Sequence, residues 1–290
     1  IKKQSVVIIF GILILFDMWS VDKRYLNETH FVEESSSSFV KTNADKKILK
    51  DTNSYRVFNL NNPFNESTTS YHHNSIGGYH AAKLLRYQEL IDRHLTKDTV
   101  INKEKKVFTY LHPNVLSMLN CGWIIKQNNK AVRSTSQGIK PAGDAWFVSE
   151  IDTVENANEE LEFLDSFNPK TTAIVDKRFL NSITKFTKDE SDTTIRLDQY
   201  KPNHLTYTLK DVTYDRLAVF SEIYYEKGWN AYINGKSKIV PHFRANYVLR
   251  AMMVPAGTTK IEFKFEPTSY SIGESVAYAS SIILLLLLGF

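Results

Sequence analysis

The sequence predicts an α+β protein in which an α/β subdomain precedes an antiparallel β-sandwich, with a membrane-spanning helix at each end. Three observations lead to this prediction. Apolar runs lie near both ends of the chain, helix and strand patterns alternate through its first half, and from about Ile195 the apolar residues recur at every second position. Such a period of two is typical of strands with one buried face.

The composition limits the function. The 290 residues carry 36 Lys and Arg against 32 Asp and Glu, a formal charge of +4 that does not favour a nucleic-acid partner. The single cysteine, Cys121, excludes an internal disulfide framework and a Cys-rich zinc module, and its own role stays open. No nucleotide-binding glycine loop, serine-nucleophile elbow or zinc-protease motif occurs, so no cofactor is expected.

The chain ends predict two membrane spans. An apolar run, Val6 to Phe16, follows Lys2 and Lys3, and a second run fills 282–290. A signal peptide begins in a similar way, but no Ala-x-Ala-like cleavage site follows, and a soluble core helix would show a polar face. We therefore expect residues 1–19 to end one transmembrane helix and 274–290 to begin the last helix of a longer multi-pass protein.

The lysine pair predicts the orientation. Positive residues beside a span favour the cytoplasmic side, so Lys2 and Lys3 put the N-terminal end of the first helix there. Residues from about 20 to 270 then lie outside the cytoplasmic membrane, and the second helix returns inward.

Between the spans we expect an α/β subdomain over 20–188 and a sandwich over 189–268. Apolar spacing, proline positions and caps predict helices over Ala44–Lys50, Tyr79–Leu95, Pro113–Leu119 and Asn156–Phe167. Strands are expected over Tyr55–Leu60, Trp123–Ile125, Ala145–Ile151 and Thr172–Val175. In the sandwich, Asn234-Gly235 predicts a tight hairpin between Ala231–Ile233 and Lys236–Val240.

One stretch before and within the predicted second helix suggests an anion site. Two glycines let the backbone approach a ligand, and the start of a helix offers free N–H groups to a phosphate. Cationic and aromatic side chains follow at helical spacing. The expected phosphate- or substrate-binding residues are Tyr71, His72, His73, Gly77, Gly78, His80, Lys83, Arg86 and Tyr87.

Two other interpretations of this stretch remain. The glycines fit a plain helix start with solvated polar side chains around it. His72, His73 and His80 also resemble metal ligands, but adjacent histidines rarely face one ion and no carboxylate has matching spacing, so no metal is expected. Likewise, the tyrosines near Trp229 fit either a sugar-binding face or the sandwich core.

Seven stretches carry a resemblance to a known family: Asp17–Trp19, Asp22–Leu26, Thr69–Gln88, Phe220–Trp229, Ala231–Gly235, Arg244–Ala251 and Val254–Gly257. They resemble the YfhO family of bacterial polytopic membrane proteins. The resemblance implies a GT-C-like membrane core that transfers a sugar from a polyprenyl-phosphate carrier to a cell-envelope glycan, with this chain as the outer domain between the last two helices. It also implies membrane lipid, the lipid-linked sugar and the glycan acceptor as partners.

The resemblance leaves the chemistry open. The catalytic carboxylate of such enzymes usually lies on the first outer loop, which this chain lacks, so whether the parent protein is an active enzyme is uncertain. Asp17 and Asp22, which flank Trp19 near the membrane surface, are candidate bases, or they are polar anchors at the helix end. The alternative function is a non-catalytic, membrane-tethered module that binds glycan or supports the envelope.

Overall fold

The computed structural model describes residues 3–31, 39–96, 112–126, 128–184 and 194–289. The chain forms two units, Ile1–Thr42 and Asn43–Phe290. The first unit is the long helix α1 (Lys3–Tyr25) followed by the single turn η1 (Glu28–His30). At 1.5 Å per residue, the 23 residues of α1 measure about 34 Å, enough to cross a bilayer core of about 30 Å.

Both predicted apolar helices are present, and both are longer than expected. Helix α1 continues past residue 19 to Tyr25, and α7 (Thr268–Gly289) begins before residue 274. Neither helix has a buried residue, and their leucine, isoleucine and phenylalanine side chains are exposed. An exposed apolar surface of this length is stable in lipid and not in water, so both helices are candidate membrane spans.

The second unit begins with a small sheet in the order β1-β2-β3. Strand β2 pairs in parallel with β1 and antiparallel with β3. The sheet and the short helices around it are β1 (Arg56–Asn59), β2 (Cys121–Ile125), β3 (Ala131–Arg133), α2 (Asn43–Ile48), α3 (Thr68–His72), α4 (Leu85–Leu90), the π-helical turn η3 (Ile91–Leu95) and α5 (Pro113–Met118). Burial raises the pKa of the Cys121 thiol to about 12, so it packs as a small apolar group in the described core.

A parallel strand pair connects this sheet to the sandwich. Strands β5 (Glu150–Val154) and β6 (Thr172–Asp176) pair in parallel, and α6 (Ala157–Phe163) crosses between them. Asn156 caps α6 by accepting the backbone N–H groups of Asn158 and Glu159. The turns η4 (Ser134–Gln137) and η5 (Lys177–Ser182) complete this half.

Two four-stranded sheets form the predicted sandwich. Their orders are β10-β13-β8-β7 and β11-β12-β9-β4, and every pair is antiparallel. The strands are β4 (Ala145–Val148), β7 (Ile195–Lys201), β8 (His204–Leu209), β9 (Arg216–Ile223), β10 (Trp229–Ile233), β11 (Phe243–Ala245), β12 (Leu249–Val254) and β13 (Lys260–Phe265). Edge-to-face contacts among Tyr207, Phe220 and Phe263 fill the space between the sheets.

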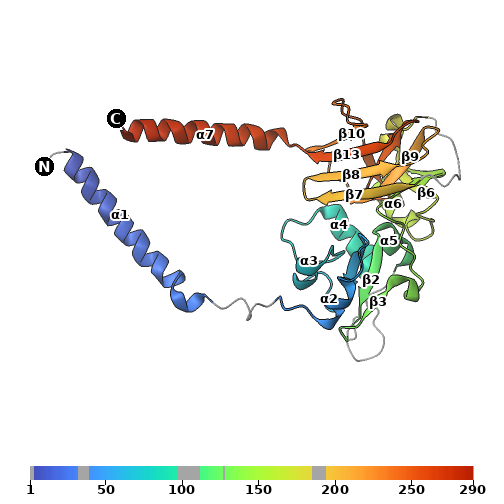
Figure 1. The fold of residues 1–290 in the computed structure, drawn as a ribbon, viewed down its shortest axis with the longest axis horizontal. Helices are drawn as coiled ribbons and strands as arrows, with labels where there is room; N and C mark the ends of the chain where they lie inside the picture. Colours follow the sequence, from blue (N-terminus) through green and yellow to red (C-terminus); the bar gives the residue numbers. More distant parts are fainter. Residues whose placement is uncertain (1–2, 32–38, 97–111, 127, 185–193, 290) are drawn as a thin grey trace. The chain divides into compact units, whose positions relative to one another are not determined.

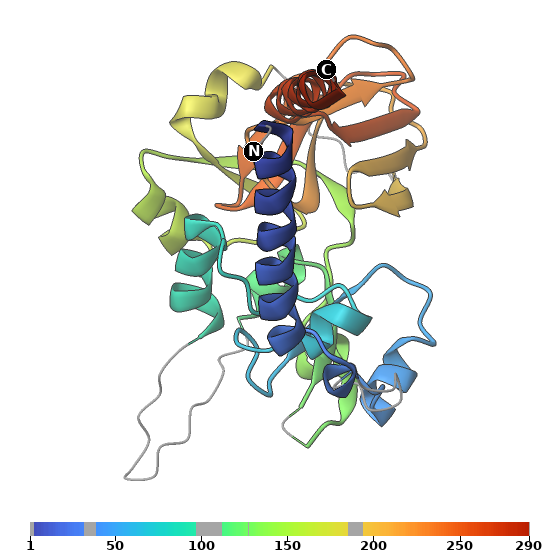
Figure 2. The ribbon, with the colours of Figure 1, turned by 90° about the vertical axis from the view of Figure 1, so that its left-hand side faces the viewer.

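The sandwich is joined to the rest of its unit. Strand β4 comes from before residue 189 and pairs with β9, so one sheet crosses the subdomain boundary expected from the sequence. A single apolar core also runs from Phe58 on β1 to Ala251 on β12. Figures 1 and 2 show the sandwich strands, in orange and red, on one side of the sheet β1–β3 and its helices, in blue and green.

The predicted helix over Tyr79–Leu95 is wrong in its first turn and a half. Leu84 is extended, and α4 begins only at Leu85. The backbone N–H groups of Gly78 and Tyr79 donate to the carbonyls of Pro63 and Glu66, at 2.8 and 3.0 Å, so this segment pairs with a distant loop instead of closing a helical turn. An ideal Cβ on Gly77 would lie 1.8 Å from the Pro63 oxygen, so this close approach requires glycine.

The predicted hairpin is confirmed at its turn and wrong in its second strand. Asn234 and Gly235 have φ values of 51° and 69°, as a type I′ turn requires. Lys236–Val240 does not form a strand, and only Val240 bridges to Ala231. Strand β10 pairs instead with β13, and the exposed Lys236–Lys238 segment has no apolar face to bury.

Candidate functional site

The structure divides the predicted anion-binding residues among three places. The first group, Tyr71, His72 and His73, borders a hollow of about 360 Å³ together with Asp51 and Trp123. His73 is already paired there, because its Nε2 lies 2.9 Å from Asp45 Oδ1. This hollow therefore offers little free positive charge to a phosphate.

The second group lines no described pocket and is locally engaged. Gly77 and Gly78 hold the chain against the Pro63–Glu66 loop, so their backbone does not face a ligand. His80 Nδ1 accepts the N–H of Ala82 at 3.0 Å, and the Lys83 ammonium lies 5.6 Å from the centre of the Phe64 ring. The expected cradle at a helix start is thus not formed by these four residues.

The third group, Arg86 and Tyr87, lies in a pocket of about 480 Å³. Three segments that are far apart in sequence form its wall: 84–87 at the start of α4, 223–227 after β9, and Arg244 with 247–248 around the β11–β12 turn. Each segment falls within a stretch that carries the family resemblance. The fold therefore brings three of the resembling stretches together at one hollow, which we take as the candidate site.

The lining of this pocket suits an anionic ligand with a ring. Arg86, Lys227 and Arg244 provide three cations, against the single carboxylate of Glu226. Tyr225 is exposed and Tyr224 is half-buried, so both add aromatic faces, whereas Tyr247 is buried and its hydroxyl donates to Glu89. Lys227 is exposed and makes no ion pair or hydrogen bond with the residues that the structure describes, so its charge is available to a ligand.

A buried carboxylate fixes the two arginines from beneath. Glu160 on α6 is fully buried, and its Oε2 accepts from Arg244 Nη2 at 2.9 Å while lying 3.7 Å from Arg86 Nη1. Burial raises the pKa of Glu160 above its usual value, and Arg244 opposes that rise. Arg86 Nη1 and Arg244 Nε have no hydrogen-bond partner in the described part of the chain, but both atoms are buried, so a ligand would meet only the exposed third of the Arg86 side chain.

Tyr247, in the pocket wall formed by the β11–β12 turn, has an unusual backbone conformation. Asn246 and Tyr247 both have positive φ, 50° and 67°, at the β11–β12 turn. Glu160 Oε1 accepts the Tyr247 N–H at 2.9 Å, and the Tyr247 hydroxyl donates to Glu89. Burial and this hydrogen bond raise the Tyr247 pKa to about 12, so the phenol stays protonated. The ring lies 4.7 Å from the Arg86 guanidinium and fixes its plane.

The pocket wall lies at the end of the sandwich where the chain enters α7. Lys227 precedes Gly228, whose carbonyl accepts the Glu266 N–H at 2.6 Å. An ideal Cβ on Gly228 would lie 3.0 Å from Pro267, the residue before α7. Only Glu266 and Pro267 separate β13 from this apolar helix, so this edge of the pocket is held within a few residues of a candidate membrane span.

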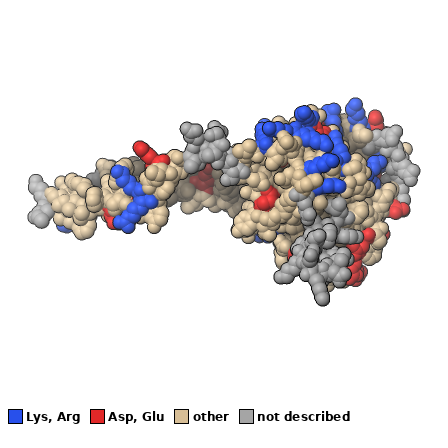
Figure 3. All heavy atoms as spheres, turned by 90° about the horizontal axis from the view of Figure 1, so that it is seen from below, with Lys and Arg blue, Asp and Glu red and all other residues tan. Residues whose placement is uncertain are grey.

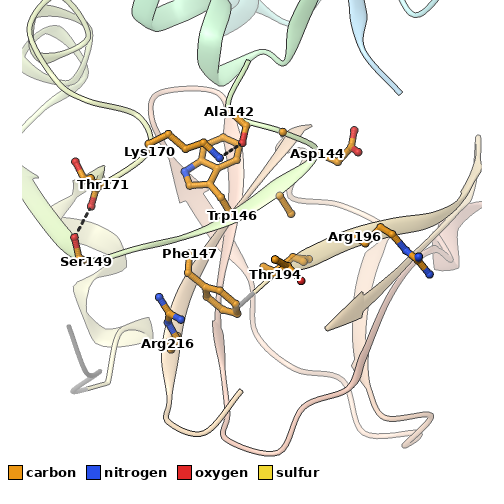
Figure 4. A pocket seen from close by; sticks show the side chains of 13 residues that line it. Ala142, Asp144, Trp146, Phe147, Ser149, Lys170, Thr171, Thr194, Arg196 and Arg216 are labelled. Atoms are coloured by element: carbon orange, nitrogen blue, oxygen red, sulfur yellow. Dashed lines mark hydrogen bonds between the residues drawn. The ribbon is translucent and has the colours of Figure 1, made fainter. Parts of the chain in front are cut away.

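A larger hollow of about 510 Å³ lies beside β4, but most of its charged groups are already engaged. Figure 4 shows Lys170 over Trp146 with its ammonium group bonded to the Ala142 carbonyl, and Arg216 beside Phe147. Asp144 on the same wall accepts from Ser54 and Asn120 at 2.5 and 2.9 Å. These contacts give the hollow a structural role.

Asp17 and Asp22 both lie on α1 and are exposed. They are five positions apart, which places their side chains on different faces of the helix. They belong to the first unit, whereas the pocket belongs to the second. Their role as catalytic bases stays a prediction.

Sequence reasoning missed Glu160 and Arg244 as members of the site, and it considered Tyr247 only as part of a possible sugar-binding face or of the sandwich core. Glu160 lies in an acidic stretch that looks solvated, because its neighbours Glu159 and Glu162 are charged. Arg244 lies in a resembling stretch, which is the only signal that could have found it. Figure 3 shows Lys and Arg side chains gathered on one part of the visible face of the folded unit.

Comparison with known proteins supports the resemblance. The model of the family described as bacterial membrane protein YfhO matches residues 166–277, which include β6 to β13, two walls of the pocket and the start of α7. No curated protein and no solved structure matches the chain. The match over residues 166–277 makes this part of the chain similar to the YfhO family of bacterial membrane proteins, and together with the two apolar helices it supports a place in a membrane.

Proposed function

We propose that this chain is the extracytoplasmic domain of a membrane glycosyltransferase-like protein, and that its pocket binds the phosphate and sugar of a lipid-linked donor. One observation carries the proposal: three of the resembling stretches converge on a pocket lined by three cations, one carboxylate and four tyrosines. Phosphate takes charge-assisted hydrogen bonds from arginine and lysine, and sugar rings pack on aromatic faces.

The position of the pocket favours a ligand anchored in lipid. Its Lys227 wall is held beside Pro267, from which α7 departs, so a phosphate at a membrane surface is within reach of the site. A polyprenyl phosphate places its charge at that depth, with its chain in the bilayer. The proposed role is to bind and orient the headgroup, and the catalytic carboxylate would come from a part of the protein outside this chain.

Arg86 is the residue to test first. Its side chain is one-third exposed, and its guanidinium lies 4.7 Å from the centre of the Tyr247 ring. A hydrogen bond to a charged group contributes about 1.5–3 kcal/mol, so Arg86→Ala should weaken phosphate binding by roughly 10- to 150-fold. Lys227→Ala should weaken it by about threefold, since Lys227 is exposed and screened by solvent.

The experiment is calorimetric titration of the full chain in detergent with farnesyl phosphate, and with farnesol as the uncharged control. Lys238→Ala serves as the matched variant, because Lys238 is an exposed lysine of the same sandwich that does not line the pocket. We expect binding of the phosphate only, reduced by Arg86→Ala and unchanged by Lys238→Ala. Equal binding of farnesol, or equal loss in Lys238→Ala, contradicts the proposal.

A further inference from the structure

We propose that His94, His112 and Asp165 form a binding site for a divalent transition-metal ion, with Zn²⁺ as the best fit. These residues belong to the second unit and none of them lines the candidate pocket. They come from three separate segments: His94 from η3, His112 from the N-cap of α5, and Asp165 from just after α6.

The ligand atoms have the spacing that a tetrahedral ion requires. Asp165 Oδ1 lies 3.0 Å from His112 Nε2 and 3.5 Å from His94 Nδ1. One ligand atom from each residue lies within 4.8 Å of the others. Zinc binds imidazole nitrogen and carboxylate oxygen at about 2.0–2.2 Å, which places adjacent tetrahedral ligands about 3.3 Å apart. The two measured separations lie on either side of that value.

The surroundings of the histidines favour an ion over an ordinary buried pair. The ring of His94 is buried near the backbone of Leu161, yet neither of its nitrogens makes a well-formed hydrogen bond within the described part of the chain. The rings of His94 and His112 meet edge to face, with centroids 5.1 Å apart. The contact from His94 Nδ1 to Asp165 Oδ1 is long for a hydrogen bond, at 3.5 Å, and a metal ion would satisfy the buried ring better.

The ion would replace the hydrogen bond between His112 Nε2 and Asp165 Oδ1, and it would also affect the cap of α5. His112 Nδ1 accepts the Val115 N–H at 3.4 Å, which caps α5. When Nε2 ligates a metal, the ring proton moves to Nδ1 and this long hydrogen bond is lost. Asp165 has a side chain that is 67% exposed, so it offers a route for the ion and leaves a fourth position open to water.

Such an ion would link two elements that support the pocket. Helix α6 carries Glu160, which holds Arg244, and α4 continues into η3 and carries Arg86 and Glu89. Asp165 follows α6 and His94 lies in η3, so one ion would fasten the two elements together. The expected role is structural support of the pocket.

The test is a calorimetric titration with ZnCl₂ of the full chain in detergent, after a chelator has removed any bound metal. We expect one ion per chain for the wild type, and a loss of affinity of at least 10- to 100-fold in Asp165→Asn and His112→Gln. His204→Gln is the matched control, because His204 Nε2 forms a similar pair with Glu262 at 3.0 Å on the sandwich. Asp165 is exposed, so Asp165→Asn should fold, and circular dichroism checks this.

Substitution with CoCl₂ gives a second readout. Tetrahedral Co²⁺ bound at this site should give visible absorption bands that Asp165→Asn and His112→Gln lose and His204→Gln keeps. Zinc should also raise the melting temperature of the wild type and not that of Asp165→Asn. Absence of stoichiometric binding to the wild type, or binding that both site variants retain, overturns the proposal.

Discussion

Removal of the Glu160 carboxylate should destabilise the folded unit strongly. This side chain is fully buried and accepts two hydrogen bonds, from Arg244 Nη2 and from the Tyr247 N–H, each at 2.9 Å. Glu160→Ala leaves both donors unpaired inside the protein, and each buried unsatisfied group costs about 1–3 kcal/mol. Breaking a buried ion pair by removing one partner costs about 3–5 kcal/mol in total, a large part of ordinary domain stability.

Glu160→Gln separates the contribution of charge from that of shape. The amide keeps one acceptor oxygen and is uncharged, so it should cost less than alanine. Burial raises the pKa of Glu160 in the folded state, so its carboxyl contributes most to stability below about pH 4.5, and that contribution is lost as the pH rises through the folded pKa. The advantage of the wild type over Glu160→Gln should therefore be smaller at pH 7 than at pH 4.

The assay is urea unfolding of the full chain in detergent at both pH values, with unfolding monitored by tryptophan fluorescence. Glu159→Ala is the matched control, because Glu159 neighbours Glu160 on α6 and is exposed. A loss below about 1 kcal/mol in Glu160→Ala, or an equal loss in Glu159→Ala, would refute the view that Glu160 anchors the arginines.

Three further predictions test the fold and the topology. Gly77→Ala should cost at least 1–3 kcal/mol in the same urea assay, because its Cβ would meet the Pro63 oxygen at 1.8 Å, and a cost near zero contradicts the close approach. The hydrogen bond from Arg178 lowers the pKa of Asp176, so the wild type should be more stable than Asp176→Asn above about pH 3.8, and this difference should vanish as the pH falls through the folded pKa. A difference that does not change with pH contradicts this pairing. Ser237→Cys, at an exposed position, should react with an impermeant maleimide in intact cells, since the native thiol of Cys121 is buried, and labelling only after lysis would place the domain in the cytoplasm.

The sequence predicts local structure well where the signal is local. The apolar ends and the Asn234-Gly235 turn depend on neighbouring residues, and each is present. The start of α4 was predicted too early, because the chain at Gly78 and Tyr79 pairs with a loop more than ten residues away. Helical spacing alone does not report such a contact.

The candidate site could be predicted only in part, for the same reason. Arg86 and Tyr87 were predicted from helical spacing, and they do line a pocket. Their partners Glu160 and Arg244 lie far along the chain, and only the fold brings them within 2.9 Å of each other. His94, His112 and Asp165 likewise have no short spacing that marks a metal site.

The most direct test of the central claim is protection of Lys227 by a lipid phosphate. The full chain in bicelles is acetylated briefly with and without farnesyl phosphate, and the modified lysines are identified by mass spectrometry. The account predicts that the phosphate protects Lys227, which lines the pocket, and leaves the exposed Lys238 as reactive as before. Equal acetylation of Lys227 with and without saturating farnesyl phosphate would contradict the assignment of this pocket as the headgroup site.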